Sequence, residues 1–472
     1  MTTAADRVAA TRAAERIPFR SRRLEALFGV PIGELQPEHV RALVNAGAEE
    51  AFDLDFKVTT YGSSGEAKRD LAGDVAALAN TAGGAIIIGV DEDDQGRATA
   101  APGVGVTDDE AVRMHQIVAA NVAPMPTIYI KKVFDPGPDL KPGFYIIAVP
   151  PSPMAPHAVL INEGKGLRYP RRNGASIRYL SEPEVAAAYR ARDLTVVQQS
   201  TRAAAIAAEA IPWLSREEPW LLLTLVPDVP GDAPITGATF EEFRSSIIES
   251  DAIVFPDAGL SYYRAQVGRR SFIADDASQT RAAHAHRTRL QVYSDGSGSY
   301  ALRLHDTSRT ALGLDIAVAE ADKPLVVNDG WLAVGVLSGL LRLGLHAGDR
   351  AATSGNGLLR LDLVMPSDGR NMELGWTRGF GGFENSRSST AAPGQPFVVE
   401  VPVELDTIAT EGPDLVTATA HIGSEIVQAF GFAELLQFTT DGQIPLKYWA
   451  QDRGGRNSLT IWANKHAIEI VS

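Results

Sequence analysis

The sequence predicts a mixed α/β domain followed by a separate α+β domain, and three observations lead to this division. All six tryptophans of the 472-residue chain lie beyond residue 212. Just before them, an alanine-rich stretch free of Gly and Pro runs from Glu184 to Ile211, which predicts a long helix. Short apolar runs and helical patterns alternate before this helix. We therefore expect an N-terminal helical segment (1–48), an α/β domain (49–192), a linking helix (193–212) and a C-terminal α+β domain (213–472).

Composition limits the class of protein. The absence of cysteine excludes disulfides, thiolate zinc sites and cysteine nucleophiles. No apolar run approaches the roughly 20 residues that span a bilayer, and the first residues lack the apolar core of a signal peptide. We therefore expect a soluble, cytoplasmic protein without membrane contact.

The charge is acidic and uneven along the chain. The formal net charge is -14, with 23 basic against 26 acidic residues up to residue 212 and 21 against 32 beyond it. Proteins that coat nucleic acid through bulk electrostatics need a surplus of Lys and Arg. Any contact with nucleic acid must therefore be local.

The stretch EEAFDLDFKVTT, residues 49–60, predicts a strand with one buried face and one charged face. The apolar residues of the buried face are Phe52, Leu54 and Phe56. The opposite face carries Asp53, Asp55 and Lys57. Glu50 would point with the phenylalanines in a regular strand, so we expect it at a bend just before the strand begins.

A helix and a second strand follow this first strand. Ser63 and Glu66 have the spacing of a capping box, and Gly83-Gly84 is expected to end the helix. The continuous apolar run AIIIGV then predicts a strand covered on both faces. Asp91 comes directly after that run, so neighbouring strands would bring Asp55 and Asp91 together.

In the second half, RLQVYSDGSGSYALRLHD predicts a hairpin whose turn lies at residues 295–298. Apolar segments at 330–348 and 417–438 predict helices, the second continuing past its internal glycines. The polar, glycine-rich segment at 366–396 predicts a long exposed loop. No catalytic or ligand-binding pattern is evident in this half.

Four blocks of the first half resemble the Schlafen-type AlbA-like domain. They are E-x4-D-F-K at 50–57, ALANTAGGAIIIGVDEDDQG at 77–96, VPPSPMAPHAV at 149–159 and YPRRNGASIRYLS at 169–181. The resemblance covers residues 45–190 and implies an α/β domain that acts on or binds nucleic acid. It implies nothing about residues 213–472.

The resemblance also implies a site. In nuclease members of that family three carboxylates hold a divalent metal for RNA cleavage, and the matching residues here are Glu50, Asp55 and Asp91. Oxygen ligands of this kind suit Mg²⁺ or Mn²⁺. Asp55 departs from the pattern, since those nucleases carry glutamate there. Lys57 would contact a phosphate or pair with Asp55. The alternative is that the three acids are ordinary solvated or paired side chains.

One run of basic residues is the best candidate for local contact with nucleic acid. The segment GKGLRYPRRNGASIR, residues 164–178, contains no acid and one aromatic residue, Tyr169. Its basic side chains are Lys165, Arg168, Arg171, Arg172 and Arg178. The alternative is a solvated hairpin whose arginines pair with neighbouring acids. A second basic cluster at residues 16–23 is weaker evidence.

The leading hypothesis is therefore a Mg²⁺- or Mn²⁺-dependent endoribonuclease that acts on tRNA-like or other structured RNA in defence or stress. The first alternative is a non-catalytic regulator that binds RNA or DNA with the same fold. The second is an assembly protein whose C-terminal domain binds a protein partner or a second copy of the chain.

Overall fold

The structure is a computed structural model and describes most of the chain. The described residues are 19–134, 142–161, 164–215, 217–248, 251–254, 260–277, 287–304, 325–353, 355–367, 372–376, 385–388, 397–449 and 453–471. The chain divides into two compact units, Met1–Val197 and Gln198–Ser472. The division falls inside one long helix, α6 (Glu182–Ala210), which confirms the helix predicted from residue 184. Each unit is described by itself.

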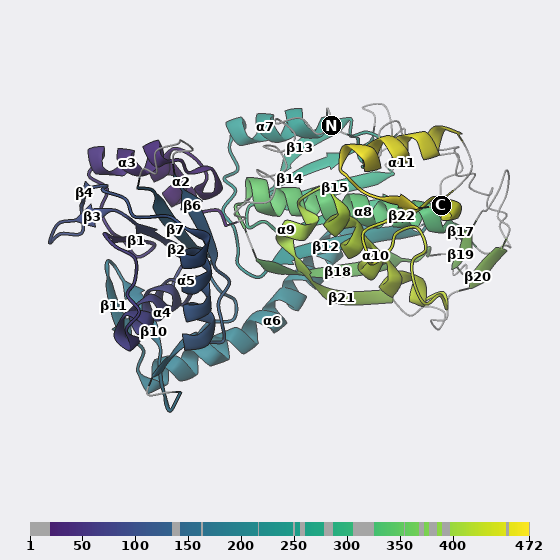
Figure 1. The fold of residues 1–472 in the computed structure, drawn as a ribbon. Coiled ribbons are helices and arrows are strands. Elements are labelled where there is room, and N and C mark those ends of the chain that lie inside the picture. The colour runs from purple at the N-terminus through teal and green to yellow at the C-terminus, as the bar shows by residue number, and fades with distance from the viewer. Residues whose placement is uncertain are drawn as a thin grey trace. The chain divides into compact units, whose positions relative to one another are not determined.

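The first unit is built on a four-stranded sheet of order β1-β2-β7-β6 (Figure 1). Its strands are β1 (Leu54–Lys57), β2 (Gly84–Ile88), β7 (Phe144–Val149) and β6 (Tyr129–Val133). β1 and β2 are parallel and the other neighbours are antiparallel. The helices are α2 (Arg22–Phe28), η1 (Ile32–Glu34), α3 (Pro37–Asn45), α4 (Gly65–Ala79) and α5 (Asp108–Asn121).

Both faces of this sheet are buried, because alternate residues of β2 contribute to two different cores. Ala85 and Ile87 pack with side chains of α2 and α3. Ile86 and Ile88 pack with side chains of α4 and α5. The prediction of a strand covered on both faces is confirmed. Residues 19–48 also share the sheet's core, since α2 and α3 cover one of its faces.

Three small sheets surround the main one. They are formed by β3 (Asp91–Glu92) with β4 (Ala98–Ala100), by β5 (Val122–Ala123), β8 (Ala158–Ile161) and β9 (Gly166–Arg168), and by β10 (Pro170–Asn173) with β11 (Ser176–Tyr179). The last pair is the β10–β11 hairpin, which contains three of the five predicted basic contacts.

Two local predictions in this unit are wrong. The first strand begins at Leu54, and Phe52 lies in a turn with 41% of its surface exposed. The turn forms because Ala51 and Leu54 bond to each other's backbone. The N-cap of α4 is Ser64, which accepts from the backbone N–H of Ala67, in place of the predicted Ser63.

The second unit is dominated by a seven-stranded antiparallel sheet of order β13-β14-β15-β16-β12-β18-β21. In chain order the strands are β12 (Trp220–Pro227), β13 (Arg264–Gly268), β14 (Ser271–Asp275), β15 (Thr288–Tyr293), β16 (Gly298–Arg303), β18 (Asn356–Val364) and β21 (Phe397–Glu404). Smaller sheets contain β17 (Leu325–Asn328), β19 (Met372–Trp376) and β20 (Asn385–Ser388), and β22 (Ile444–Pro445) with β23 (Ile470–Val471).

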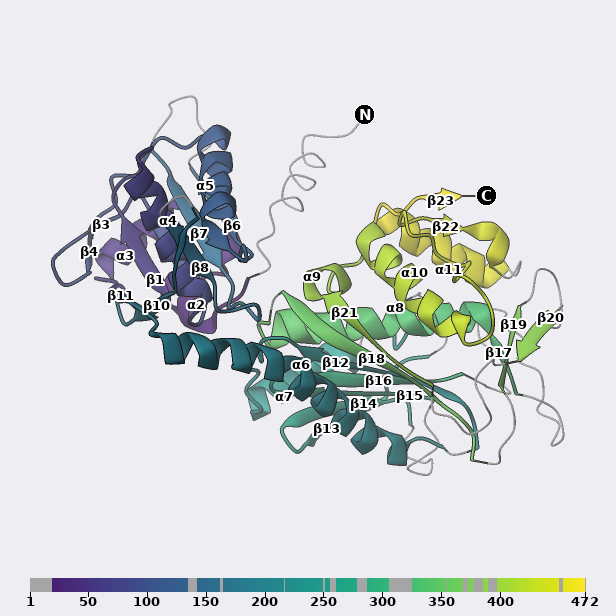
Figure 2. The same ribbon diagram turned by 90° about the horizontal axis from the view of Figure 1, so that it is seen from below.

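Helices cover both faces of the large sheet (Figure 2). Residues of α8 (Asp329–Leu345) and α10 (Pro413–Gln428) share the main core with one face. Ala203, Ile206 and Ala207 of α6 pack on the other face. Further helical segments are η2 (Ile211–Trp213), α7 (Gly237–Ile248), η3 (His346–Arg350), α9 (Leu405–Ile408), η4 (Leu446–Tyr448) and α11 (Arg453–Lys465). The segment Asp329–Arg350 has the length and apolarity of a membrane span, but 89% of its 18-residue apolar window is buried inside the protein.

The predicted fold class, an α/β domain followed by an α+β domain, is confirmed. The hairpin around residues 295–298 is formed by β15 and β16, and α8 occupies the first predicted apolar helix. The second apolar helix is shorter than predicted, because α10 ends at Gln428 and Gly431 takes a positive φ of 75°. The segment predicted as one long loop contains strands β19 and β20.

Candidate functional site

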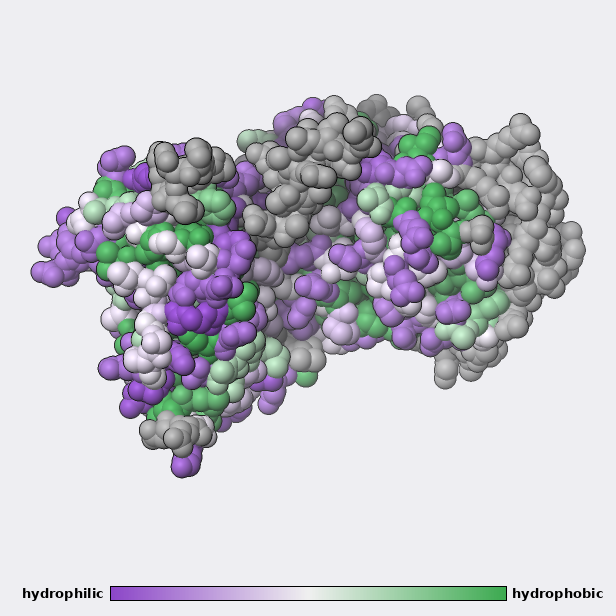
Figure 3. All heavy atoms as spheres, in the orientation of Figure 1, coloured by the Kyte–Doolittle hydropathy of each residue, from purple (hydrophilic) through white to green (hydrophobic). Residues whose placement is uncertain are grey.

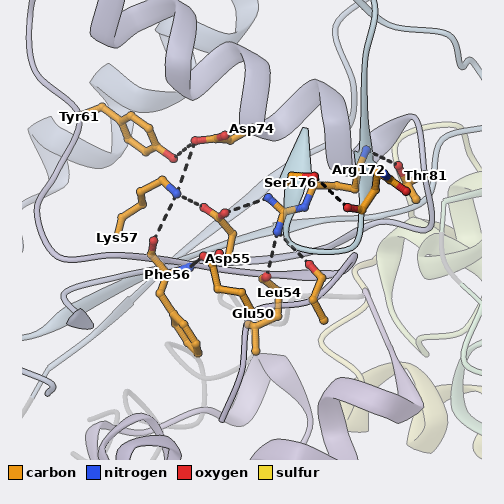
Figure 4. Close-up of polar contacts among 12 residues, drawn as sticks. Glu50, Leu54, Asp55, Phe56, Lys57, Tyr61, Asp74, Thr81, Arg172 and Ser176 are labelled. Carbon is orange, nitrogen blue, oxygen red and sulfur yellow. Dashed lines mark hydrogen bonds and ion pairs between the residues drawn. The ribbon is translucent and has the colours of Figure 1, made fainter. Parts of the chain in front are cut away.

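Asp55 is buried on β1 and lies at the centre of a cluster of ionisable side chains. Its side chain is 4% exposed and accepts a hydrogen bond of 2.9 Å from Arg172 Nη1 at Oδ1. Lys57 Nζ donates to the other oxygen, Oδ2 (Figure 4). Both oxygens of this carboxylate are therefore engaged by cations of the same chain. We call Glu50, Asp55, Asp74, Lys57 and Arg172 the Asp55 cluster.

Arg172 reaches this cluster from β10. Its Nη2 donates to the carbonyl oxygens of Ala51 at 2.8 Å and Leu54 at 3.2 Å. Its backbone N–H donates to Thr81 Oγ1 at 3.0 Å, beyond the C-terminal end of α4. One residue thus joins the β10–β11 hairpin to β1, to the turn before β1 and to the end of α4.

Asn80 supports the same junction from the end of α4. Its Nδ2 donates to the carbonyl oxygens of His157 and Pro170, both at 2.8 Å, and its Oδ1 accepts from the His157 N–H at 2.6 Å. From the sequence we attributed the end of this helix to Gly83-Gly84 and did not predict the roles of Asn80 and Thr81. The available signal was a polar pair directly after the apolar last turn of the helix.

Glu50 directly precedes the Ala51–Leu54 turn that leads into β1, and its side chain folds back onto the strand. Its Oε1 accepts from the backbone N–H of Phe56 at 2.7 Å. Burial, followed by the neighbouring charge of Asp55, raises the pKa of Glu50 to about 8. This carboxyl group is therefore largely protonated at neutral pH.

Asp74 and Tyr61 complete the surroundings of Lys57. Tyr61 donates from its hydroxyl to Asp74 Oδ2 at 2.7 Å, and Lys57 Nζ lies 3.9 Å from the same oxygen. Burial and the charge of Asp55 raise the pKa of Asp74 to about 6. Burial lowers the pKa of Lys57, but Asp55 and Asp74 together raise it above its ordinary value. Lys57 is a charged member of the Asp55 cluster and pairs with Asp55, one of its two predicted roles.

The raised pKa of Glu50 makes the stability of the first unit depend on pH. The folded unit holds this proton up to about pH 8, whereas the unfolded chain releases it near 4.5. The free energy of unfolding should therefore fall as pH rises between these values. After allowance for partial exposure we expect a loss of about 1–2 kcal/mol. Hydrogen exchange of the β1 and β2 amides, corrected for intrinsic rates, measures this loss.

The control for this prediction is Glu50→Gln, which cannot titrate. Its stability should change little between pH 7 and 8, where Asp74, with a pKa of about 6, is largely deprotonated. A variant whose stability falls as steeply as that of the wild type over this range would assign the effect to another group.

Asp91 does not join Asp55, contrary to prediction. The strand β2 ends at Ile88, and Asp91 lies in the separate ribbon of β3 and β4, where it is exposed and accepts from the backbone N–H of Glu92. The outer end of the first unit around this ribbon is hydrophilic (Figure 3). Glu92, like Asp55, raises the pKa of Glu50 through its negative charge.

The arrangement of these acids does not fit a divalent metal. Within the described part of the chain, no three His, Asp or Glu side chains form a group that could hold a metal ion. Each oxygen of Asp55 already accepts from a cation, Lys57 or Arg172, so a metal ion at this carboxylate would meet two positive groups. We therefore derive no metal-dependent step from Glu50, Asp55 and Asp91.

The basic run divides between the two faces of the β10–β11 hairpin. Pro170 and Arg172 are buried and Arg171 and Asn173 are exposed, as the alternation of a strand requires. Arg172, which we predicted as a phosphate contact, is 5% exposed and points into the Asp55 cluster. A buried side chain held by a carboxylate cannot reach a phosphate, so this assignment does not hold in the folded unit.

The other four basic residues lie at or near the surface. Arg171 is exposed and stands directly opposite Arg178, which pairs with Glu184 at 2.9 Å. Arg168 is exposed, and its guanidinium lies 5.3 Å from the ring centre of Tyr179, which is itself 54% exposed. Lys165 is exposed but makes interactions within the protein. Arg171 and Arg178 therefore share one face of the hairpin, whereas Tyr179, which stands opposite Pro170, belongs to the other face, where its ring is still accessible.

Comparison with known proteins assigns this unit to a family. Residues 50–180 match the model of the family described as Schlafen, AlbA_2. This part of the chain is therefore a Schlafen AlbA-like domain, as its four sequence blocks predicted. The match does not extend to the second unit, and a search of curated proteins found no match.

Two solved structures resemble parts of the chain. One is the DIP2311 protein from Corynebacterium diphtheriae, with 24% identity, a TM-score of 0.23 and coverage of 36% of this chain and 29% of the other. The second is the N-terminal domain of a protein related to the ATP-dependent DNA helicase RecG, from Nitrosomonas europaea, with 18% identity, a TM-score of 0.22 and coverage of 31% and 95%. The chain thus spans less than a third of the first of these relatives.

Proposed function

We propose that the first unit binds nucleic acid through the outer side of the β10–β11 hairpin. The observation that carries this proposal is the opposition of Arg171 and Arg178 across the two strands, with the exposed ring of Tyr179 following Arg178 on the other face of the hairpin. Arginines contact phosphates through charge and hydrogen bonds, and an exposed aromatic ring can stack on a base. Membership of residues 50–180 in the Schlafen AlbA_2 family supports the same function.

A local surface of this kind suits an acidic protein. The chain as a whole carries a formal charge of -14, so long-range attraction of a polyanion is weak. Few phosphates are neutralised by a hairpin of this size, and affinity should fall only moderately with salt. The proposed role is recognition of RNA or DNA by a small site, without coating of the polymer.

Reversing the charge of Arg171 should weaken this binding. We expect Arg171→Glu to lower the affinity for RNA about tenfold and to reduce the slope of log affinity against log salt by about 1. Fluorescence anisotropy at several salt concentrations measures both quantities. The matched control is Arg69→Glu, the same charge change at an exposed position in the first half of α4. Equal losses in both variants would point to bulk charge and contradict a site on the hairpin.

Metal-dependent cleavage of RNA is the function that the family resemblance implies beyond binding. The occupied oxygens of Asp55 do not support it. Incubation of the full chain with RNA and Mn²⁺, with and without EDTA, is the test, and we expect no cleavage. Cleavage that EDTA stops and Asp55→Asn abolishes would establish a nuclease. Binding of a protein partner or a second copy through residues 213–472 stays a prediction.

A further inference from the structure

The β10–β11 hairpin carries two adjacent arginines with opposite orientations. Arg171 lies on its outer face, and Arg172 is buried between the hairpin and β1. The side chains of Arg172 and Asp55 are 2% and 4% exposed, so their ion pair is almost entirely removed from water. A pair so deeply buried is not a general property of surface hairpins, whose arginines are normally solvated.

We infer that Arg172 takes the place of a divalent cation at Asp55 and thereby fixes the position of the β10–β11 hairpin. The inference rests on the proposed function only for its nucleic-acid readout. Arg172 is a positioning residue, since it lies beneath the binding surface and acts through the strand that carries Arg171.

The contacts of Arg172 account for both parts of this role. Its guanidinium neutralises Asp55 and at the same time donates to two backbone carbonyls, those of Ala51 and Leu54. A planar group with several fixed donors and a delocalised charge can meet three acceptors in a buried site. Its backbone N–H bonds to Thr81, so the strand itself is held as well as the side chain.

The charges around Asp55 fit a site in which a side-chain cation of the same chain replaces a bound metal ion. Lys57 and Arg172 are the two cations of the cluster, and they face Asp55 and Asp74 together with Glu50. With both cations in place, a divalent ion would have to approach two positive groups at contact distance from Asp55. Removing Arg172 would free Oδ1 of Asp55 and take away one of the two positive groups that repel a divalent ion there.

The first test measures the response to Mn²⁺ by thermal unfolding of the full chain. Millimolar Mn²⁺ should not raise the Tm of the first unit in the wild type, whereas it should raise it in Arg172→Gln. Arg172→Lys, which keeps a cation at this position, should respond as the wild type does. A rise in the wild type that Asp55→Asn abolishes would overturn the inference, as would equal responses of the wild type and Arg172→Gln.

The second test follows the hairpin itself by hydrogen exchange. In Arg172→Gln the amide at position 172, which donates to Thr81, should lose protection while the amides of β2 and β7 keep theirs. The matched control is Arg171→Gln, the same chemical change one residue away on the outer face, which should leave this protection unchanged. Unchanged protection in Arg172→Gln would overturn the positioning role. If that variant does not fold, the same comparison is made with Arg172→Lys, in which partial loss is expected.

Nucleic-acid affinity separates this inference from the proposed function. Arg172→Gln should lower the affinity for RNA about tenfold although residue 172 does not reach the surface, and Arg171→Gln should also weaken binding, because it removes a phosphate contact directly. Full affinity in Arg172→Gln together with weakened binding in Arg171→Gln would overturn the inference and leave the proposed function standing. If RNA binds none of the variants or the wild type, the proposed function fails, and the exchange and Mn²⁺ results still decide the role of Arg172.

Discussion

Replacing Asp55 with alanine is expected to destabilise the first unit by about 3–5 kcal/mol, because it removes one partner of a buried ion pair. Arg172 would keep its contacts to the carbonyls of Ala51 and Leu54 but would lose the carboxylate that pairs with it. Lys57 would lose the same partner and retain Asp74 at 3.9 Å. The buried positive charge, and not the lost contact alone, makes the effect large.

Asp53→Ala is the matched control for this prediction. Asp53 lies two residues earlier and also pairs with an arginine, since Arg23 Nε donates to its Oδ2 at 2.7 Å. Arg23 is 44% exposed, so water can replace the lost partner, and we expect a loss of only about 1 kcal/mol. Hydrogen exchange of the β2 amides compares the two variants, because the six tryptophans lie outside this unit.

A double variant tests whether Asp55→Ala is destabilising because it leaves Arg172 buried without the carboxylate that pairs with it. Arg172→Met removes the charge and keeps much of the volume, so Asp55→Ala with Arg172→Met should be more stable than Asp55→Ala alone. If Asp55→Ala is no more harmful than Asp53→Ala, or if the double variant is less stable than the single one, the pair is not the anchor that we describe.

The second large effect is expected at Gly84, the first residue of β2. A Cβ atom there would lie 2.3 Å from the carbonyl oxygen of Asp53 and 2.7 Å from its Cα, at a φ of +150°. The neighbouring backbone cannot yield easily, because the N–H of Ala85 donates to that same oxygen at 2.9 Å. Gly84→Ala should therefore destabilise the unit by about 3 kcal/mol or more, from steric overlap together with backbone strain.

Gly73 in α4 provides a control of opposite sign. A Cβ atom at Gly73 would meet no atom within 4 Å, and the residue lies inside a helix. Gly73→Ala should therefore stabilise the unit by about 0.5–1 kcal/mol. Urea unfolding followed by far-UV circular dichroism and hydrogen exchange measures both variants. A Gly84→Ala protein as stable as the wild type would show that β1 and β2 are not packed as closely as described.

The strand, helix and strand of the first unit were predictable because their signals are local. The apolar run at 85–90 and the glycine pair before it specify a buried strand after a helix end, and the structure has both. The fold class of both units also followed from local patterns. Phe52 was assigned wrongly because a turn closed by two backbone hydrogen bonds leaves no mark in a period-two pattern.

The site was harder to predict, because its geometry depends on contacts between distant segments. Arg171 and Arg172 are the same residue type, and only the register of β10 decides which one is buried. Asp91 follows β2 in sequence, but β2 ends at Ile88 and Asp91 belongs to a separate two-stranded ribbon, where its side chain is exposed. Asn80 and Thr81 join segments that are 77 to 91 residues apart, a separation that local reasoning cannot bridge.

The measurement that tests the central claim most directly is photo-crosslinking of the full chain to RNA that contains 4-thiouridine, followed by mapping of the linked peptides. Binding by the outer side of the β10–β11 hairpin predicts crosslinks within residues 165–180 and their loss in Arg171→Glu. Crosslinks confined to the second unit, or unchanged by Arg171→Glu, would contradict the account.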